Sequence, residues 1–229
     1  MWLYYCLLIG SVIVPLILSF DKKLQFYKQW KYLFPAIIFV AAIYIGFDIY
    51  LTKIRVWGFN PAYHCSIVFM GLPLEEWLFF IVIPYASIFL HDSFVLYFPQ
   101  VYLHGKTVFY LGLVLMTALA VLAILHFDKS YTAYIFVTGL VAIGLSFFDK
   151  SKTIHHFYIT FLIILIPFFA VNAILTGTFI ENEVVWYNNQ ENLGIRILTI
   201  PIEDFVYGFS MILLVLLVRE RLRKTRTVQ

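Results

Sequence analysis

The chain has 229 residues, of which 62% are hydrophobic, 20% aromatic and only 13% charged, and its formal net charge is +3. Soluble domains carry about 25% charged residues, so this chain has too little polar surface for a water-exposed fold. The composition excludes a soluble domain and predicts an integral membrane protein with little mass outside the bilayer. Two cysteines, Cys6 and Cys65, are by themselves too few for a disulfide framework or a four-ligand zinc site.

Seven apolar runs along the chain have the length that crosses a membrane. About 20 apolar residues span the hydrocarbon core of a bilayer, and such runs occupy residues 2–20, 32–51, 71–90, 107–125, 131–148, 157–176 and 199–218. The first run is too long, and too lightly charged at its start, for a cleaved signal peptide. The sequence therefore predicts an all-α, polytopic membrane protein with seven transmembrane helices.

Lysine and arginine are distributed unevenly between the two sides of this predicted bundle. Twelve lie on one side, namely Lys22, Lys23, Lys28, Lys31, Lys106, Lys150, Lys152, Arg219, Arg221, Arg223, Lys224 and Arg226, and four on the other, namely Lys53, Arg55, Lys129 and Arg196. Cytoplasmic loops carry the excess of basic residues, so we expect a multi-pass cell-membrane protein with its N-terminus outside and its C-terminus cytoplasmic. The basic tail is interpreted as a topology anchor beside anionic lipid, and no nucleic-acid role is predicted.

An internal repeat relates the two ends of the chain at an offset of 128 residues. Three matches share this offset: Phe-Asp-Lys at 20–22 and 148–150, Asn60 and Asn188, and Leu-Pro-Leu-Glu-Glu at 72–76 with Ile-Pro-Ile-Glu-Asp at 200–204. They predict a first repeat over residues 1–92, a linking helix within 93–128, and a second repeat with the basic tail over 129–229. One linking span restores the direction of the chain, so the two three-helix repeats are parallel, in a 3+1+3 arrangement.

Each repeat places two acidic residues at the start of its third span, Glu75 and Glu76 in the first and Glu203 and Asp204 in the second. Carboxylates inside a membrane are costly, so they mark function by default and face the bundle interior. The alternative is that they only complement the positive end of a helix dipole at the membrane interface. The repetition of the motif at one depth, near the outer leaflet, favours a chemical role.

Neighbouring residues of a helix point about 100° apart, so one acid of each motif is expected to reach the centre of the bundle. The leading pair is Glu75 with Glu203, and Glu76 and Asp204 are expected to stand behind them. Tyr207 lies four residues after Glu203 and is expected to share its face. Two carboxyls that converge in an apolar cavity cannot both ionise cheaply, which predicts an acid and a base within one site.

Other polar and aromatic residues are weaker candidates. Four of them could line the site, bond across helices or cap loops, with the structural interpretation favoured for each: Asp48, Asn60, Asn172 and Asn188. The candidate substrate-binding residues are Pro73, Trp77, Phe79, Phe80, Pro201, Tyr207, Asn60 and Asn188, and the rings after the first motif could face a cation. The histidines and carboxylates show no spacing typical of a metal site, and no nucleotide or flavin motif is present.

The two motifs resemble those of the membrane-integral lycopene cyclase family. The resemblance rests on Leu-Pro-Leu-Glu-Glu-Trp-Leu-Phe-Phe at 72–80 and Ile-Pro-Ile-Glu-Asp-Phe-Val-Tyr at 200–207. These small cyclases occur as two separate subunits in some bacteria and as a fused domain in fungi and archaea, with one such motif in each half. The present chain resembles both halves fused, over nearly its whole length, with Asp204 in the place of Glu76.

The resemblance implies an enzyme of carotenoid biosynthesis, an isomerase (intramolecular lyase) that converts the psi ends of lycopene to the beta-ionone rings of gamma- and then beta-carotene. An acid would protonate the terminal double bond, the neighbouring double bond would attack the cation, and a base would remove a proton. It implies no cofactor, and as partners the lipophilic polyene and membrane lipid. A homo-oligomer, association with other carotenoid enzymes, an epsilon ring, and the assignment of acid and base all stay open.

Three other functions are weighed against this one. A retinal protein or seven-helix sensor would need a lysine within the last span, and residues 199–218 contain none. A proton-coupled transporter usually has inverted repeats with broken helices, whereas these repeats are parallel. A cyclase or hydratase that acts on another polyene or terpenoid is the nearest alternative.

Overall fold

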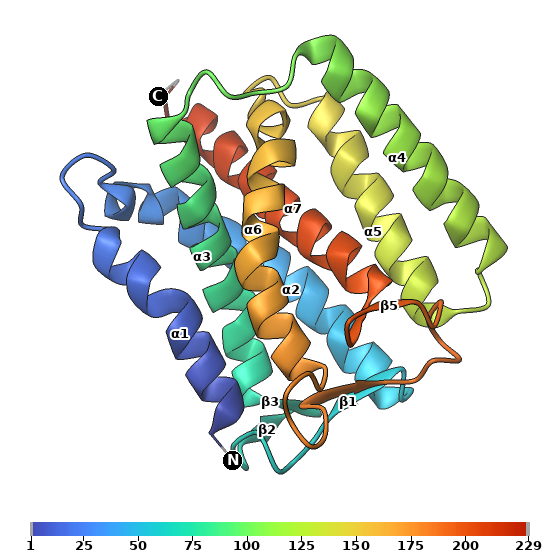
Figure 1. The fold of residues 1–229 in the computed structure, drawn as a ribbon. Helices are drawn as coiled ribbons and strands as arrows, with labels where there is room; N and C mark the ends of the chain where they lie inside the picture. The colour runs from blue at the N-terminus through green and yellow to red at the C-terminus, as the bar shows by residue number, and fades with distance from the viewer. Residues whose placement is uncertain (1, 228–229) are drawn as a thin grey trace.

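The computed structural model describes residues 2–227 and shows a bundle of helices (Figure 1). The ends of the two predicted repeats, Met1 and residues 228–229, lie outside the described residues. Within that range the bundle has seven α-helices, which are α1 (Leu3–Leu18), α2 (Trp30–Lys53), α3 (Leu74–Tyr97), α4 (Gly105–Leu125), α5 (Ser130–Phe147), α6 (Thr153–Leu175) and α7 (Ile202–Thr227). A short 3-10 helix, η1 (Phe26–Gln29), precedes α2.

Within residues 2–227, five helical segments are long and apolar enough to cross a membrane: Phe26–Lys53, Leu74–Tyr97, Gly105–Leu125, Ser130–Phe147 and Thr153–Leu175. The apolar helix α1 is shorter, with 16 residues, and α7 has an apolar middle between an acidic first turn and a basic end. Both run alongside the other helices (Figure 1). The predicted all-α, polytopic membrane fold is confirmed.

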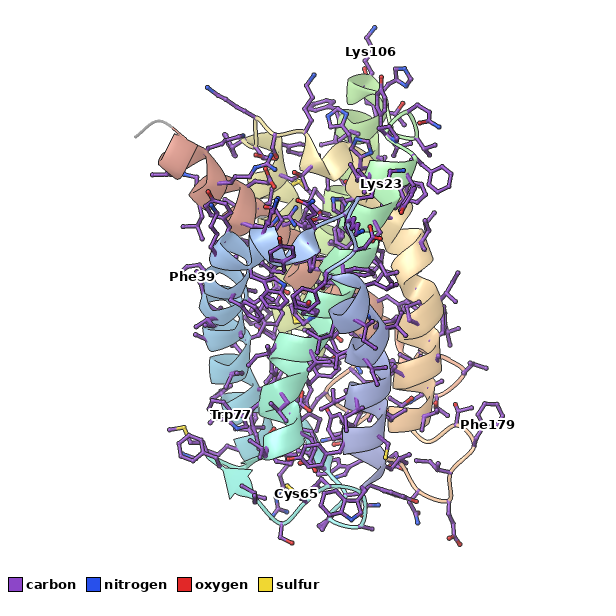
Figure 2. All side chains as sticks on the ribbon, turned by 90° about the vertical axis from the view of Figure 1, so that its left-hand side faces the viewer. Lys23, Phe39, Cys65, Trp77, Lys106 and Phe179 are labelled. Atoms are coloured by element: carbon purple, nitrogen blue, oxygen red, sulfur yellow. The ribbon has the colours of Figure 1, made fainter. Side chains whose placement is uncertain are left out.

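The outer surface of the bundle is apolar around its middle and charged at one end. Phe39, Leu162 and Ile124 point outward with 58%, 65% and 75% of their side chains exposed, as lipid contact requires of a membrane helix. Lys23 and Lys106 extend from the same end of the bundle (Figure 2). Two of the twelve basic residues that the sequence assigns to one side therefore lie at the same end of the molecule.

The 128-residue offset recurs in the backbone. Each repeat forms a two-stranded antiparallel ribbon directly before its third helix, with β2 (Val68–Phe69) and β3 (Leu72–Pro73) in the first and β5 (Arg196–Ile197) and β6 (Ile200–Pro201) in the second. The turns of the two ribbons contain Met70 and Leu198, whose φ angles are 54° and 56°. The linking helix α4 packs beside α5 at the edge of the bundle (Figure 1).

A third ribbon joins the two repeats to each other. β1 (Trp57–Phe59) pairs antiparallel with β4 (Val185–Tyr187), and Gly58 lies opposite Trp186, its equivalent at the offset of 128. The main-chain N–H groups of Asn60 and Asn188 each bond a carbonyl of the other repeat at 2.8 Å. A local two-fold axis therefore passes through the Gly58–Trp186 pair. The helical periodicity of the sequence did not predict these short strands, which satisfy loop backbone groups next to the apolar helices.

The third helices of the repeats, α3 and α7, are tied together at the opposite end. Arg219 of α7 donates to both carboxylate oxygens of Asp92 in α3, at 2.6 and 3.0 Å, a bidentate geometry that fixes both position and orientation. Between these ends, the Tyr44 hydroxyl of α2 lies 2.8 Å from that of Ser210 in α7. The ribbons thus hold the starts of α3 and α7 at one end of the bundle. The Asp92–Arg219 ion pair joins the two helices near the other end.

Candidate functional site

The prolines of the two motifs lie in the ribbons rather than in the helices. Pro73 is the N-cap of α3, with φ −65° and ψ 153°, and Pro201 immediately precedes α7 in β6. The next residues, Leu74 and Ile202, each donate their N–H to the preceding loop at 3.0 Å. Both prolines are buried, and neither lines the cavity described below. They fix an extended chain just before the helix, because the proline ring holds φ near this value.

Glu75 and Glu203 anchor loops rather than face the cavity. Both are 0% exposed, and Glu75 accepts the N–H of Cys65 at 2.6 Å. Glu203 accepts the N–H of Leu193 at 2.8 Å and the Thr132 hydroxyl at 2.7 Å. Cys65 and Leu193 are themselves 128 residues apart. The prediction that Glu75 and Glu203 form the inner pair is therefore wrong in its geometry, because these carboxyls turn back to the loops that precede their helices.

Glu76 and Asp204 are the acids that the two repeats present to one another. They are 8% and 6% exposed and both line a single cavity. Tyr4 of α1 donates its hydroxyl to Glu76 at 2.5 Å. Asp204 accepts the hydroxyl of Tyr131 in α5 and, at 3.0 Å, that of Tyr187 in β4. Burial raises the pKa of Tyr187, so its phenol remains a hydrogen-bond donor.

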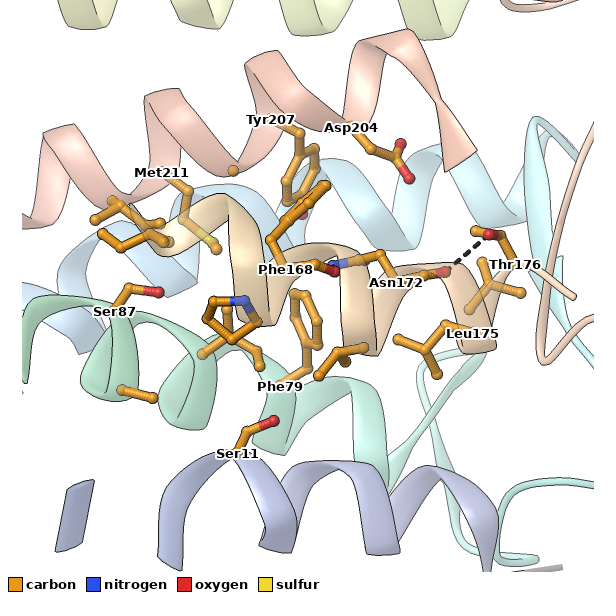
Figure 3. A pocket seen from close by; sticks show the side chains of 18 of the residues that line it. Ser11, Phe79, Ser87, Phe168, Asn172, Leu175, Thr176, Asp204, Tyr207 and Met211 are labelled. Carbon is orange, nitrogen blue, oxygen red and sulfur yellow. Dashed lines mark hydrogen bonds between the residues drawn. The ribbon is translucent and has the colours of Figure 1, made fainter. Parts of the chain in front are cut away.

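The cavity has a volume of about 450 Å³ and lies between α1, α3, α6 and α7, beneath the β1–β4 ribbon. Figure 3 shows Asp204 and Tyr207 projecting from α7 toward Phe168 and Asn172 of α6, with Phe79 of α3 below them. Its walls are mostly apolar, as is usual for small-molecule sites. Acidic groups lie at the end near the ribbon, and mostly apolar side chains, with Ser11, Ser87 and Asn172 among them, line the remainder.

The cavity opens sideways, between α1 and α6, at the surface that faces lipid. Val14 of α1 and Ile166 of α6 both line it, and they are also 56% and 72% exposed on the outside of the bundle. Gly10 of α1 and Pro167 of α6 also line the cavity and are exposed, so the exposed part of its wall lies along these two helices. An apolar molecule dissolved in the bilayer can therefore approach the acids without passing through water.

Asp48 is a third carboxyl of the cavity. It comes from α2, is 1% exposed and accepts the Tyr207 hydroxyl at 3.3 Å. Tyr207 faces the cavity as predicted, although it shares this face with Asp204 rather than with Glu203. Sequence reasoning set Asp48 aside, yet a carboxylate in the middle of an apolar span is itself the signal that marks a functional residue. Among residues 2–227, no group of three His, Cys, Asp or Glu side chains is arranged to hold a metal.

Aromatic rings surround the acidic end of the cavity. The rings that line the cavity are those of Tyr4, Trp57, Phe59, Phe79, Phe89, Tyr131, Phe168, Tyr187 and Tyr207. Two rings of the predicted set lie elsewhere. Trp77 donates its indole N–H to the carbonyl of Phe69 at 3.3 Å, on the outer side of α3, and Phe80 is buried against Tyr44.

The two repeated asparagines, Asn60 and Asn188, cap loops. The side-chain oxygen of Asn60 accepts the N–H of Ala62 at 3.0 Å, and that of Asn188 accepts the N–H of Gln190 at 3.1 Å. Both residues lie outside the cavity, so the structure supports the loop-capping interpretation. Asn172, by contrast, lies on the cavity wall and was not among the predicted substrate-binding residues.

The segments of the chain that match a known protein family coincide with the two repeats. The family model described as Lycopene cyclase matches residues 1–94 and 128–222. These segments include α1 to α3 and α5 to α7 almost completely, and the linking helix α4 lies between them. No curated protein and no solved structure matches the chain.

Proposed function

Because this chain belongs to the lycopene cyclase family, we propose that it closes the psi ends of lycopene into beta-ionone rings by acid–base isomerisation at Glu76 and Asp204. The family cyclises lycopene. The apolar cavity is the proposed binding site for the reacting end of this substrate. The observation that carries the mechanism is that equivalent carboxyls of the two repeats line one apolar cavity. Glu75 and Glu203 are proposed to position the motif through the loops that they bind.

The proposed reaction adds one proton and removes another. The acid protonates C2 of the terminal double bond, which leaves a cation at C1. The double bond between C5 and C6 then attacks, so that a bond forms between C1 and C6 and the charge moves to C5. The base removes the proton from C6, and a double bond between C5 and C6 completes the beta ring. No electrons are exchanged with the protein, and the proton taken by the base balances the one given by the acid.

The surroundings of the two carboxyls suggest which one plays each role. Asp204 accepts two phenol hydrogen bonds, from Tyr131 and Tyr187, whereas Glu76 accepts one, from Tyr4. Hydrogen bonds to a carboxylate favour its ionised form, so we assign Asp204 as the base and Glu76 as the acid. The ring faces near them carry negative electrostatic potential and are suited to stabilise the cation between the two proton transfers.

The proposal is tested by expressing the protein in bacteria that accumulate lycopene and separating the pigments by chromatography. We expect the wild type to form cyclic carotenoids. Glu76→Gln and Asp204→Asn should each lower ring formation by about a hundredfold or more, as expected when a general acid or base is removed. The amount of each protein in the membrane should stay near that of the wild type.

Glu75 provides a matched control, because it is the same residue type as its neighbour Glu76 but bonds a loop and does not line the cavity. Glu75→Gln should weaken the bond to the Cys65 N–H and lower the amount of folded protein, while the remaining molecules cyclise normally. A Glu76→Gln variant with wild-type pigments would remove this carboxyl from the mechanism. Conversion of a different polyene, with lycopene left unchanged, would support the alternative substrate.

A further inference from the structure

The cavity is symmetric at its acidic end. Near the ribbon it is lined by residues that the 128-residue offset relates in pairs: Trp57 with Val185, Phe59 with Tyr187, Glu76 with Asp204, and Phe79 with Tyr207. The local two-fold axis through the β1–β4 ribbon therefore passes through this part of the site. A symmetric protein would continue the cavity equally on both sides of the axis.

Beyond the acids, the cavity extends on one side only, between α1, α3, α6 and α7. We call this part the open arm and define it by Gly10, Ser11, Ala86, Asn172 and Gly208, all on its wall. The lining residues of α3 run from Glu76 to Leu90, which are 14 residues apart, or about 21 Å along the helix. The open arm is thus long, and its exposed wall lies along α1 and α6.

The equivalent space on the other side, between α2, α3, α5 and α7, is filled by side chains. Phe80 stands at the position equivalent to Gly208, and Tyr44 at the position equivalent to Asn172. Both are 0% exposed, and their ring centroids lie 6.5 Å apart. Tyr44 also packs edge-on against Tyr134 of α5, at 6.4 Å. The difference between the two sides therefore arises where one repeat has a large ring and the other a small residue.

We propose that the linear tail of the substrate occupies the open arm alone, and that Gly208 and Asn172 are the specificity-determining positions that admit it. The inference rests on the proposed function and adds the binding site of the tail. With one arm, the reacting end always meets Glu76 and Asp204 in the same orientation. Two acids that are equivalent in the repeat thereby keep different roles in the reaction.

The test fills the open arm with the residues that fill the other side. Gly208→Phe and Asn172→Tyr should each lower cyclisation of the full-length polyene at least tenfold. A short polyene with the same acyclic end needs no arm, so both variants should lower its cyclisation far less than that of the full-length polyene. In Gly208→Ala, the new Cβ would lie 3.4 Å from the Phe168 ring, an ordinary contact, and the loss should be smaller.

Gly46→Phe is the matched control, because Gly46 is exposed on α2 and a Cβ there meets nothing within 4 Å. It should leave both substrates unaffected. Wild-type rates on the full-length polyene in Gly208→Phe would overturn the inference. Loss of both substrates in a variant that accumulates normally would also overturn it. Should Gly208→Phe fail to accumulate, Asn172→Tyr and Gly208→Ala carry the same comparison. The wild-type protein in this assay tests the proposed function separately.

Discussion

Each carboxyl of the cavity is paired with the hydroxyl of a tyrosine. The pairs are Glu76 with Tyr4, Asp204 with Tyr131 and Tyr187, and Asp48 with Tyr207. A buried carboxyl without a donor is strongly destabilising, whereas a neutral phenol satisfies it without neutralising its charge. The acids can therefore remain charged or neutral in an apolar site, as the proposed acid–base chemistry requires.

Asp48 and Tyr207 are expected to act as one unit. Asp48→Asn should lower cyclisation by about tenfold, less than Glu76→Gln, because Asp48 is proposed to shape the field around the cation rather than to transfer the proton. Tyr207→Phe should have a similar effect, since it removes the hydrogen bond at 3.3 Å. The double variant should be no worse than the more affected single variant, as coupled residues are not additive. Fully additive losses in pigment assays would show that the two act independently.

Deuterium labelling can follow the proton that the acid is proposed to deliver. Because a carboxyl exchanges its proton with water between turnovers, cyclisation in D2O should place one deuterium at ring C2 for every ring formed. The base removes a different proton, from C6, so the label should survive in the product. Mass spectrometry and NMR of the purified carotenoid measure it. Product without deuterium at C2 would contradict activation by a protein carboxyl.

At the scale of the elements, the β1–β4 ribbon sets how the two repeats meet. The Trp186 ring lies directly over Gly58, and a Cβ added there would lie 2.3 Å from the ring atom Cζ2. The ribbon also carries Trp57 and Tyr187, which line the acidic end of the cavity. Only glycine allows this close approach. The Gly58–Trp186 pair therefore sets how the two repeats pack together and where the ribbon residues that line the cavity lie.

Gly58→Ala is therefore expected to destabilise the protein by about 1–3 kcal/mol, as other overpacked sites do. Thermal unfolding in detergent, followed by loss of the folded fraction, measures the change. Trp186→Ala in the same chain should restore much of the lost stability, because it removes the ring that the new methyl group meets. Gly46→Ala, on an exposed helix face with open space around it, should not destabilise. Equal effects of the two glycine substitutions would contradict the close-approach explanation.

At the scale of the whole molecule, basic residues favour one orientation in the membrane. Twelve lysines and arginines follow one side of the seven-helix path and four the other. We propose that the C-terminus is cytoplasmic and that the β1–β4 ribbon, with the acids beneath it, lies near the outer leaflet.

A reporter fused after the last residue should behave as cytoplasmic. Tags inserted after Pro61 and after Glu181, both exposed, should be reached by impermeant reagents from outside, and a tag after Lys22 should be protected. Accessibility in intact and permeabilised cells is the measurement. Protection of the Pro61 and Glu181 tags in intact cells would reverse the orientation, although both motifs would still share one side.

Much of the site could be predicted from the sequence, but not which acids face the cavity. The repeat and the cost of carboxylates in a membrane pointed to Glu75, Glu76, Glu203 and Asp204. Adjacent residues differ by about 100° around the helix, and the rotation of α3 and α7 depends on loops that the motif does not contain. In those loops, the main-chain N–H groups of Cys65 and Leu193 bond the first acid of each motif, Glu75 and Glu203. The phenol of Tyr4, distant in sequence, is bonded to the inner acid Glu76.

Composition, the length of the apolar runs and the constant offset predict the membrane class, the helical fold and the two parallel repeats, because all three are properties of the chain alone. That Glu76 and Asp204 share a cavity, and that this cavity extends to one side, follows from how the helices pack. These outcomes depend on volumes contributed by different helices, such as Gly208 where the other repeat has Phe80. Packing joins residues far apart in the chain, and no local pattern records which space they leave empty.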